Sequence, residues 1–198
     1  MIKAIIFDFG GILSIRASLR SFGEFYAPKF GANIEELNKL LVDNWHKARI
    51  NKIKSKLFWE NSANFLKTDK DILRKDFIDY FGFNYEVLEF VKKLKKNYRL
   101  GLLSNNIEDW LEEIIEKHKL NKIFDVIVTS YNSRIAKPDI RVFEEIVQKL
   151  SVNPKECVYI DDMEKNIPPA KHLGMKTILF KDIRQMKKEL VDLGVKID

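Results

Sequence analysis

Five short apolar segments are spread along the sequence, and stretches with helical periodicity separate the last four of them. Each segment is three or four residues long, as is typical of strands buried on both faces of a sheet. Strands that alternate with helices of about 10–15 residues form βαβ units with parallel strands. The sequence therefore predicts an α/β fold with a doubly wound parallel sheet. The expected strands are residues 4–7, 100–103, 126–128, 158–160 and 177–180.

The strand pattern is absent for about seventy residues after Gly11. Apolar and aromatic residues recur there at helical spacing, Asn33 and Glu36 form a candidate capping pair, and Gly82 is a candidate helix end. These signals predict a helical insertion between the first strand and the rest of the sheet. Its four helices are expected around residues 19–26, 33–45, 57–65 and 69–82.

The first strand stops abruptly at Asp8, which is followed by Gly10 and Gly11. Ligands of open α/β sheets bind beyond the carboxyl ends of the strands, so Asp8 lies where a site is expected. Glycine lets the backbone turn sharply and approach a ligand closely. The alternative interpretation is that Asp8 only caps a turn.

Polar residues also follow three later strands. Ser104 and Asn105 end the second strand, where a hydroxyl and backbone N–H groups can hold phosphate oxygens; the alternative is a helix cap. Lys137 precedes Pro138, which is expected in the first turn of the next helix; the alternative is an ordinary surface lysine. The fourth strand ends in Asp161-Asp162.

Adjacent carboxylates repel each other unless a cation compensates them. Asp8, Asp161 and Asp162 are expected to converge at one edge of the sheet, which would make an oxygen site suited to Mg²⁺ and a substrate phosphate. The alternative is that Asp161-Asp162 forms a solvated turn.

Composition narrows the class of protein further. The chain has 198 residues, one cysteine and a net charge of +6. No apolar stretch approaches the roughly 18 residues that span a membrane, and the apolar run near the start is too short for a signal peptide. No nucleic-acid motif accompanies the basic charge. We expect a cytoplasmic protein without membrane or nucleic-acid partners, whose oligomeric state the sequence leaves open.

The four motifs together resemble those of the haloacid dehalogenase-like superfamily. These motifs are Ile5 to Gly11, Leu102-Leu103-Ser104, Lys137-Pro138 and Val158 to Asp162, and they follow the family's order. The resemblance implies a Rossmann-like core formed by residues 1–14 and 84–198, with residues 15–83 as a helical cap. It also implies an Mg²⁺-dependent phosphatase that acts on a small phosphorylated metabolite through a phosphoaspartate.

The resemblance assigns roles to individual residues. Asp8 would be the nucleophile and a metal ligand, and Lys137 would neutralise the transferred phosphoryl group. Asp162 would contact the metal directly, Asp161 mainly through water, and Gly10 through its carbonyl oxygen. Ser104 and Asn105 would bind phosphate. Apart from the resemblance, the basic residues Arg49 and His46 lie between the second and third helices of the cap, where a segment could face the active site and bind the rest of an anionic substrate; the alternative for His46 is packing beside Trp45.

Gly10 departs from the family pattern, which has a general acid/base aspartate at this position. One consequence would be a catalytically impaired phosphate-binding or regulatory protein, and the other a substitute acid such as Glu108. A branch of the family resembling sugar-phosphate phosphatases carries Asp-x-Gly here, which favours catalysis. The intact Asp161-Asp162 pair favours phosphoryl transfer over haloacid dehalogenation.

Overall fold

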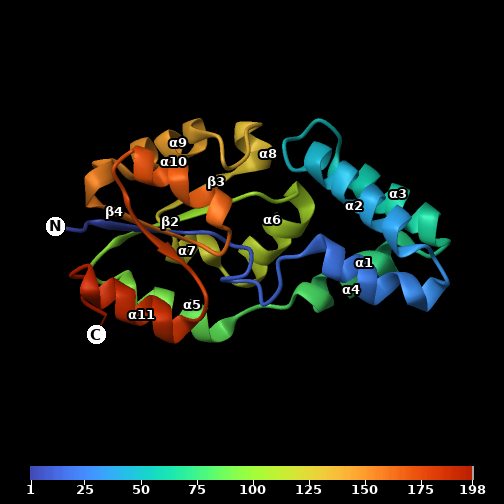
Figure 1. Cartoon of the computed structure of the whole chain (residues 1–198), viewed down its shortest axis with the longest axis horizontal. Coiled ribbons are helices and arrows are strands. Elements are labelled where there is room, and N and C mark those ends of the chain that lie inside the picture. The colour runs from blue at the N-terminus through green and yellow to red at the C-terminus, as the bar shows by residue number, and fades with distance from the viewer. Residues whose placement is uncertain (198) are drawn as a thin grey trace.

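The computed structural model describes residues 1–197, and these contain a five-stranded sheet whose strands are all parallel (Figure 1). The strand order is β3-β2-β1-β4-β5. The first strand along the chain is thus central, between the second and the fourth, which confirms the predicted doubly wound sheet. The strands are β1 (Ala4–Phe7), β2 (Arg99–Ser104), β3 (Val126–Thr129), β4 (Cys157–Asp161) and β5 (Lys176–Leu179).

Helices cover both faces of the sheet. In β1, Ile5 and Phe7 pack into one hydrophobic cluster while Ala4 and Ile6 pack into another, and all four side chains are fully buried. This alternation explains why the strand is a continuous apolar run. The first cluster includes residues of α5 (Tyr85–Leu94), α6 (Glu108–Lys117) and α11 (Ile183–Asp192), and the second includes residues of α9 (Ile140–Leu150) and α10 (Ile167–His172).

The start of α9 differs from the prediction. Pro138 does not lie in the first turn, because Asp139 is the N-cap and its side chain accepts a hydrogen bond from the backbone N–H of Arg141 at 3.1 Å. Aspartate is a strong N-cap, so the helix begins after it. Short elements were not predicted either: α7 (Leu120–Ile123), α8 (Ser130–Ser133) and the 3₁₀ helices η1 (Ala27–Phe30), η2 (Pro154–Glu156) and η3 (Glu164–Asn166).

Four helices between β1 and α5 form the helical cap at one end of the molecule (Figure 1). Ser18, Asn33 and Asp69 cap three of them with side-chain oxygens. The last ends at Gly82, whose φ of 61° suits glycine. The helices are α1 (Leu19–Tyr26), α2 (Ile34–Ala48), α3 (Ser55–Leu66) and α4 (Lys70–Phe81).

Trp110 of α6 joins the cap to the sheet. Its ring centroid lies 5.9 Å from that of Phe9, next to the end of β1, and 5.8 Å from that of Trp45 on α2. It also lies 5.1 Å from both Phe77 and Phe81 on α4. Aromatic pairs at these separations stabilise an interface beyond the area they bury. The cap therefore shares a continuous hydrophobic cluster with the helices of one face of the sheet.

The two chain segments that connect cap and sheet run beside each other. The backbone N–H groups of Ile15 and Arg16 both donate to the carbonyl of Phe81 at 3.1 Å, and Asn84 N–H donates to the carbonyl of Leu13 at 2.8 Å. Among residues 1–197, no helix combines the length and the apolar character that a membrane crossing requires.

Candidate active site

Three carboxylates meet at the carboxyl ends of β1 and β4. The two strands pair with Phe7 opposite Ile160, so Asp8 and Asp161 follow at the same level of the sheet. Asp8, Asp161 and Asp162 each offer an oxygen, and these oxygens all lie within 4.8 Å of one another. The expected convergence of the three acids is therefore present.

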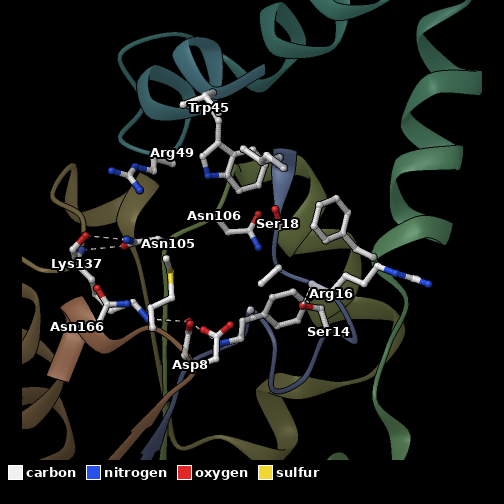
Figure 2. Close-up of a pocket in the computed structure, with 18 of the residues that line it drawn as sticks. Asp8, Ser14, Arg16, Ser18, Trp45, Arg49, Asn105, Asn106, Lys137 and Asn166 are labelled. Carbon is white, nitrogen blue, oxygen red and sulfur yellow. Dashed lines mark hydrogen bonds and ion pairs between the residues drawn. The ribbon is translucent and has the colours of Figure 1, made fainter. Parts of the chain in front are cut away.

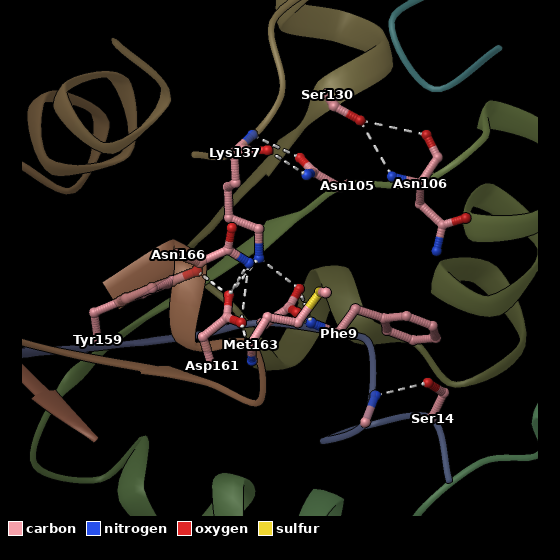
Figure 3. A network of polar contacts seen from close by, with 12 residues as sticks. Phe9, Ser14, Asn105, Asn106, Ser130, Lys137, Tyr159, Asp161, Met163 and Asn166 are labelled. Atoms are coloured by element: carbon pink, nitrogen blue, oxygen red, sulfur yellow. Dashed lines mark hydrogen bonds and ion pairs between the residues drawn. The ribbon is translucent and has the colours of Figure 1, made fainter. Parts of the chain in front are cut away.

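Lys137 lies between two of these acids. Its Nζ atom is 2.7 Å from Asp8 Oδ1 and 2.8 Å from Asp161 Oδ2, and the side chain is almost completely buried (Figure 3). The Asn105 amide fixes the lysine backbone, because it accepts from Lys137 N–H and donates to the Lys137 carbonyl, each at 2.9 Å. A residue at the end of β2 thus positions the lysine that precedes α9.

Asp161 and Asp162 have different surroundings. Asp161 accepts hydrogen bonds from Met163 N–H at 2.8 Å and from Asn166 Nδ2 at 3.0 Å, and also from the Tyr159 hydroxyl. Asp162 Oδ1 is buried without any hydrogen-bond partner among residues 1–197. A buried, unpaired carboxylate oxygen is costly unless a cation binds it. The donor set therefore fits a divalent cation, with Asp162 as the open ligand and Asp161 already occupied by protein donors.

The pKa values of the cluster also distinguish Asp161 from Asp8 and Asp162. Burial raises the pKa of Asp8 to about 7, against the opposing effect of Lys137. Burial and the charge of Asp161 raise the pKa of Asp162 to about 6. Although burial alone would raise the pKa of Asp161, its ion pair with Lys137 lowers it. Burial disfavours the Lys137 ammonium, but the two carboxylates raise its pKa. Ionising Asp8 and Asp162 is thus unfavourable in the metal-free protein, and a bound cation would favour their charged forms.

The two glycines after Asp8 have different constraints. Gly11 has a φ of 66°, and a Cβ there would lie 2.2 Å from Asp162 Oδ2, so this position requires glycine. Gly10 is outside the positive-φ region, and a Cβ there would have its nearest contacts at 3.5 Å from Ala17 Cβ and 3.7 Å from Asp8 Oδ2. The backbone therefore does not exclude a side chain at position 10.

A cavity of about 830 Å³ separates the acidic cluster from the cap (Figure 2). Trp45 points into it from α2, and Arg49 lies at the C-terminal end of the same helix. The predicted site residues that line it are Asp8, Gly10, His46, Arg49, Asn105, Lys137 and Asp162.

Two predicted site residues lie outside the cavity lining. Ser104 is buried at the end of β2, and Asp161 is buried beneath the surface that Asp8 and Asp162 form. Glu108, the candidate substitute acid, does not line the cavity either. Arg16 lines it, but its guanidinium donates to the Tyr80 carbonyl at 2.5 Å and lies over the Tyr80 ring, away from Asp8 (Figure 2).

Other lining residues were not identified from the sequence. Asn106 and Trp110 follow Asn105 by one and five positions, so their closeness to the end of β2 was the signal that could have identified them. Glu164 and Lys165 lie in the short η3 helix, which has no periodicity to reveal it. Ser18 lines the cavity as well and caps α1.

Comparisons with known proteins agree with this geometry. A family model described as haloacid dehalogenase-like hydrolase matches residues 5–180. The chain is 27% identical over 214 aligned positions to the D-ribitol-5-phosphate phosphatase of Bacteroides thetaiotaomicron, covering 96% of this chain and 97% of that protein. It is 30% identical over 115 residues to bifunctional epoxide hydrolase 2 of Sus scrofa, covering 54% of this chain but only 20% of that protein's length.

The fold is also that of a solved enzyme. The structure of a haloacid dehalogenase family enzyme from Bacteroides thetaiotaomicron, in complex with magnesium and inorganic phosphate, superposes with a TM-score of 0.76 at 24% identity. The superposition covers 94% of this chain and 99% of that chain. Since the family model matches most of the sequence, this chain belongs to the haloacid dehalogenase-like hydrolases.

Proposed function

We propose that this protein is an Mg²⁺-dependent phosphatase of a small phosphorylated metabolite and forms a phosphoaspartate on Asp8. The observation that carries the proposal is the donor set at the strand ends: Lys137 joins Asp8 to Asp161, while Asp162 Oδ1 has no protein partner among residues 1–197. Hard carboxylate oxygens of this kind are the ligands that Mg²⁺ prefers. Asp8, Asp162 and the Gly10 carbonyl would hold the ion, with Asp161 supporting them.

Asp8 is arranged for nucleophilic attack. Its Oδ1 accepts from Lys137 and from Phe9 N–H at 2.6 Å, which leaves Oδ2 without a donor among residues 1–197. Oδ2 would attack phosphorus as the ester P–O bond breaks, and the leaving oxygen would depart as an oxide ion that takes its proton from water, because Gly10 offers no acid. Water would then attack the phosphoaspartate, releasing phosphate and restoring the carboxylate.

Lys137 neutralises charge on the phosphoryl oxygens during both displacements, because its ammonium is fixed beside the nucleophile. Bound Mg²⁺ would supply further neutralisation of the same oxygens. The relatives support this chemistry: one is a ribitol-phosphate phosphatase, and the enzyme of similar fold binds magnesium and phosphate. We also propose that residues 15–83, as the cap, select the substrate.

The test is hydrolysis of a small aryl phosphate. An aryl ester is suitable because its leaving group needs no proton. We expect phosphate release that depends on Mg²⁺ and stops on addition of a chelator. The family also contains dehalogenases, so chloride release from a 2-chloro acid should be measured in parallel. Halide release without phosphate release would contradict the proposal. Neither activity, with phosphate binding retained, would support the impaired phosphate-binding protein that Gly10 suggests.

Mg²⁺ should stabilise the folded protein, since only the folded state brings Asp8 and Asp162 together. At ten times its dissociation constant, such a ligand adds about 1.4 kcal/mol to the free energy of unfolding. For a chain of this size the melting temperature should rise by about 3–6 °C. Thermal melts with and without Mg²⁺ measure this rise.

Asp162→Ala should abolish the increase, whereas Asp192→Asn, an exposed acid at the end of α11, should leave it unchanged. Equal increases in wild type and Asp162→Ala would place the magnesium ion elsewhere.

A further inference from the structure

Arg49 presents a partly buried positive charge to the cavity and has no counter-ion among residues 1–197. Its Nε atom is buried and has no hydrogen-bond partner among residues 1–197. Burial lowers the pKa of Arg49, and no carboxylate in the part of the chain that the structure describes offsets that effect. Removing a guanidinium from water without a partner is unfavourable. An anion that binds from outside the chain would compensate this charge.

Two further basic groups line the same cavity near Arg49. His46 lies one turn earlier on α2, and Lys165 belongs to η3, on the opposite, sheet side of the cavity. Burial lowers the pKa of His46, and the charges of Arg49 and Lys165 lower it further, which shows that cap and core bring like charges together here. Among residues 1–197, Glu164 is the only lining carboxylate besides Asp8 and Asp162.

The size of the cavity indicates that the phosphoryl group fills only part of it. A volume of about 830 Å³ is in the range of pockets for ligands well beyond the size of inorganic phosphate. In Figure 2, Asp8 lies on the floor of the cavity, and Trp45 and Arg49 both lie on the cap side. A substrate with its phosphoryl group at Asp8 would extend across the cavity towards the cap side, where Arg49 and Trp45 lie.

We propose that Arg49, together with His46 and Lys165, binds a second anionic group of the substrate, which would then be a phosphorylated metabolite that also carries a carboxylate or a second phosphate. The inference rests on the proposed phosphatase function and specifies its substrate class. A guanidinium group binds either anion through paired N–H donors. The subsite would therefore recognise an oxyanion at the far end of the substrate, either a planar carboxylate or a tetrahedral phosphate.

Binding of three phosphonates of matched length in the presence of Mg²⁺ tests this subsite without requiring turnover. Propylphosphonate has a neutral tail, 3-phosphonopropionate a carboxylate tail, and ethane-1,2-diyl bisphosphonate a second phosphonate. By calorimetry, wild type should bind at least one anionic-tail compound about 10-fold more tightly than propylphosphonate, because a charge-assisted hydrogen bond contributes that much. The anionic compound with the larger gain in affinity over propylphosphonate identifies the second anionic group of the substrate.

Arg49→Ala should remove this preference and Lys165→Ala should reduce it. The matched control is Lys52→Ala, a basic residue that follows α2 but does not line the cavity, and it should keep the preference. Circular dichroism verifies the fold of each variant.

Equal affinity for all three phosphonates in wild type, or a preference that survives in Arg49→Ala, would overturn the subsite. Failure of all three to bind would overturn both the subsite and the phosphate site. Absence of aryl phosphate hydrolysis with the preference intact would instead count against the proposed function alone.

Discussion

Replacing Asp8 by Asn should lower kcat/KM for an aryl phosphate by about 10⁴-fold or more, the scale seen when a catalytic nucleophile is removed. An amide oxygen is a poor nucleophile and cannot form the phosphoaspartate. The substitution is nearly isosteric, so the Phe9 N–H and Lys137 donors next to Oδ1 keep an acceptor. Steady-state hydrolysis at saturating Mg²⁺ measures the loss.

The fold should survive this change. Lys137 is fully buried between two carboxylates, and Asp8→Asn leaves the second of them, Asp161, at 2.8 Å. The burial that raises the pKa of Asp8 also means that ionising this group in the folded protein is unfavourable without a cation. The melting temperature of the metal-free variant should therefore stay close to that of wild type. A folded Asp8→Asn protein with more than a tenth of the wild-type activity would mean that water attacks the substrate directly.

The sequence was most informative about strands and helices that are determined by their own residues. The strand at residues 4–7 was predicted because both of its faces are buried, so all four residues are apolar. Three of the four cap helices begin at residues whose side chains cap them, Ser18, Asn33 and Asp69, and Asn33 was visible as such a signal. Acids at strand ends were expected to converge because parallel strands share one carboxyl edge.

What could not be predicted depends on contacts between distant segments. Nothing in the sequence indicates that the Asn105 side chain fixes the Lys137 backbone, 32 positions away. The distinct environments of Asp161 and Asp162 were known only through the family resemblance. They arise because Tyr159, Met163 and Asn166 all donate to Asp161. Likewise, Trp110 connects cap and sheet through aromatic contacts to residues about 30 to 100 positions earlier.

Gly10→Asp should increase hydrolysis of alkyl phosphates by up to about 10²-fold, the lower end of what general acid–base catalysis provides. Alkoxide is a poor leaving group without a proton, whereas an aryl oxide leaves unaided. The structure permits the substitution: Gly10 is outside the positive-φ region, and its Cβ would be in ordinary contact with Ala17. The effect is measured by hydrolysis rates for a series of esters of rising leaving-group pKa. The rate should fall less steeply with leaving-group pKa in the variant than in wild type.

Gly10→Asn is the matched control, because it fills the same space without an ionisable carboxyl and should not accelerate alkyl esters. The Cβ of the new side chain would lie 3.7 Å from Asp8 Oδ2, so the added carboxyl places a further negative charge near the acidic cluster, and the assay requires saturating Mg²⁺. A folded, Mg²⁺-binding Gly10→Asp protein with no gain on alkyl esters would show that the proton already comes from another group. Glu164 is then the first residue to replace, because it lines the cavity and Glu108 does not. Loss of alkyl ester hydrolysis in Glu164→Gln, with aryl ester hydrolysis less affected, would identify the alternative acid.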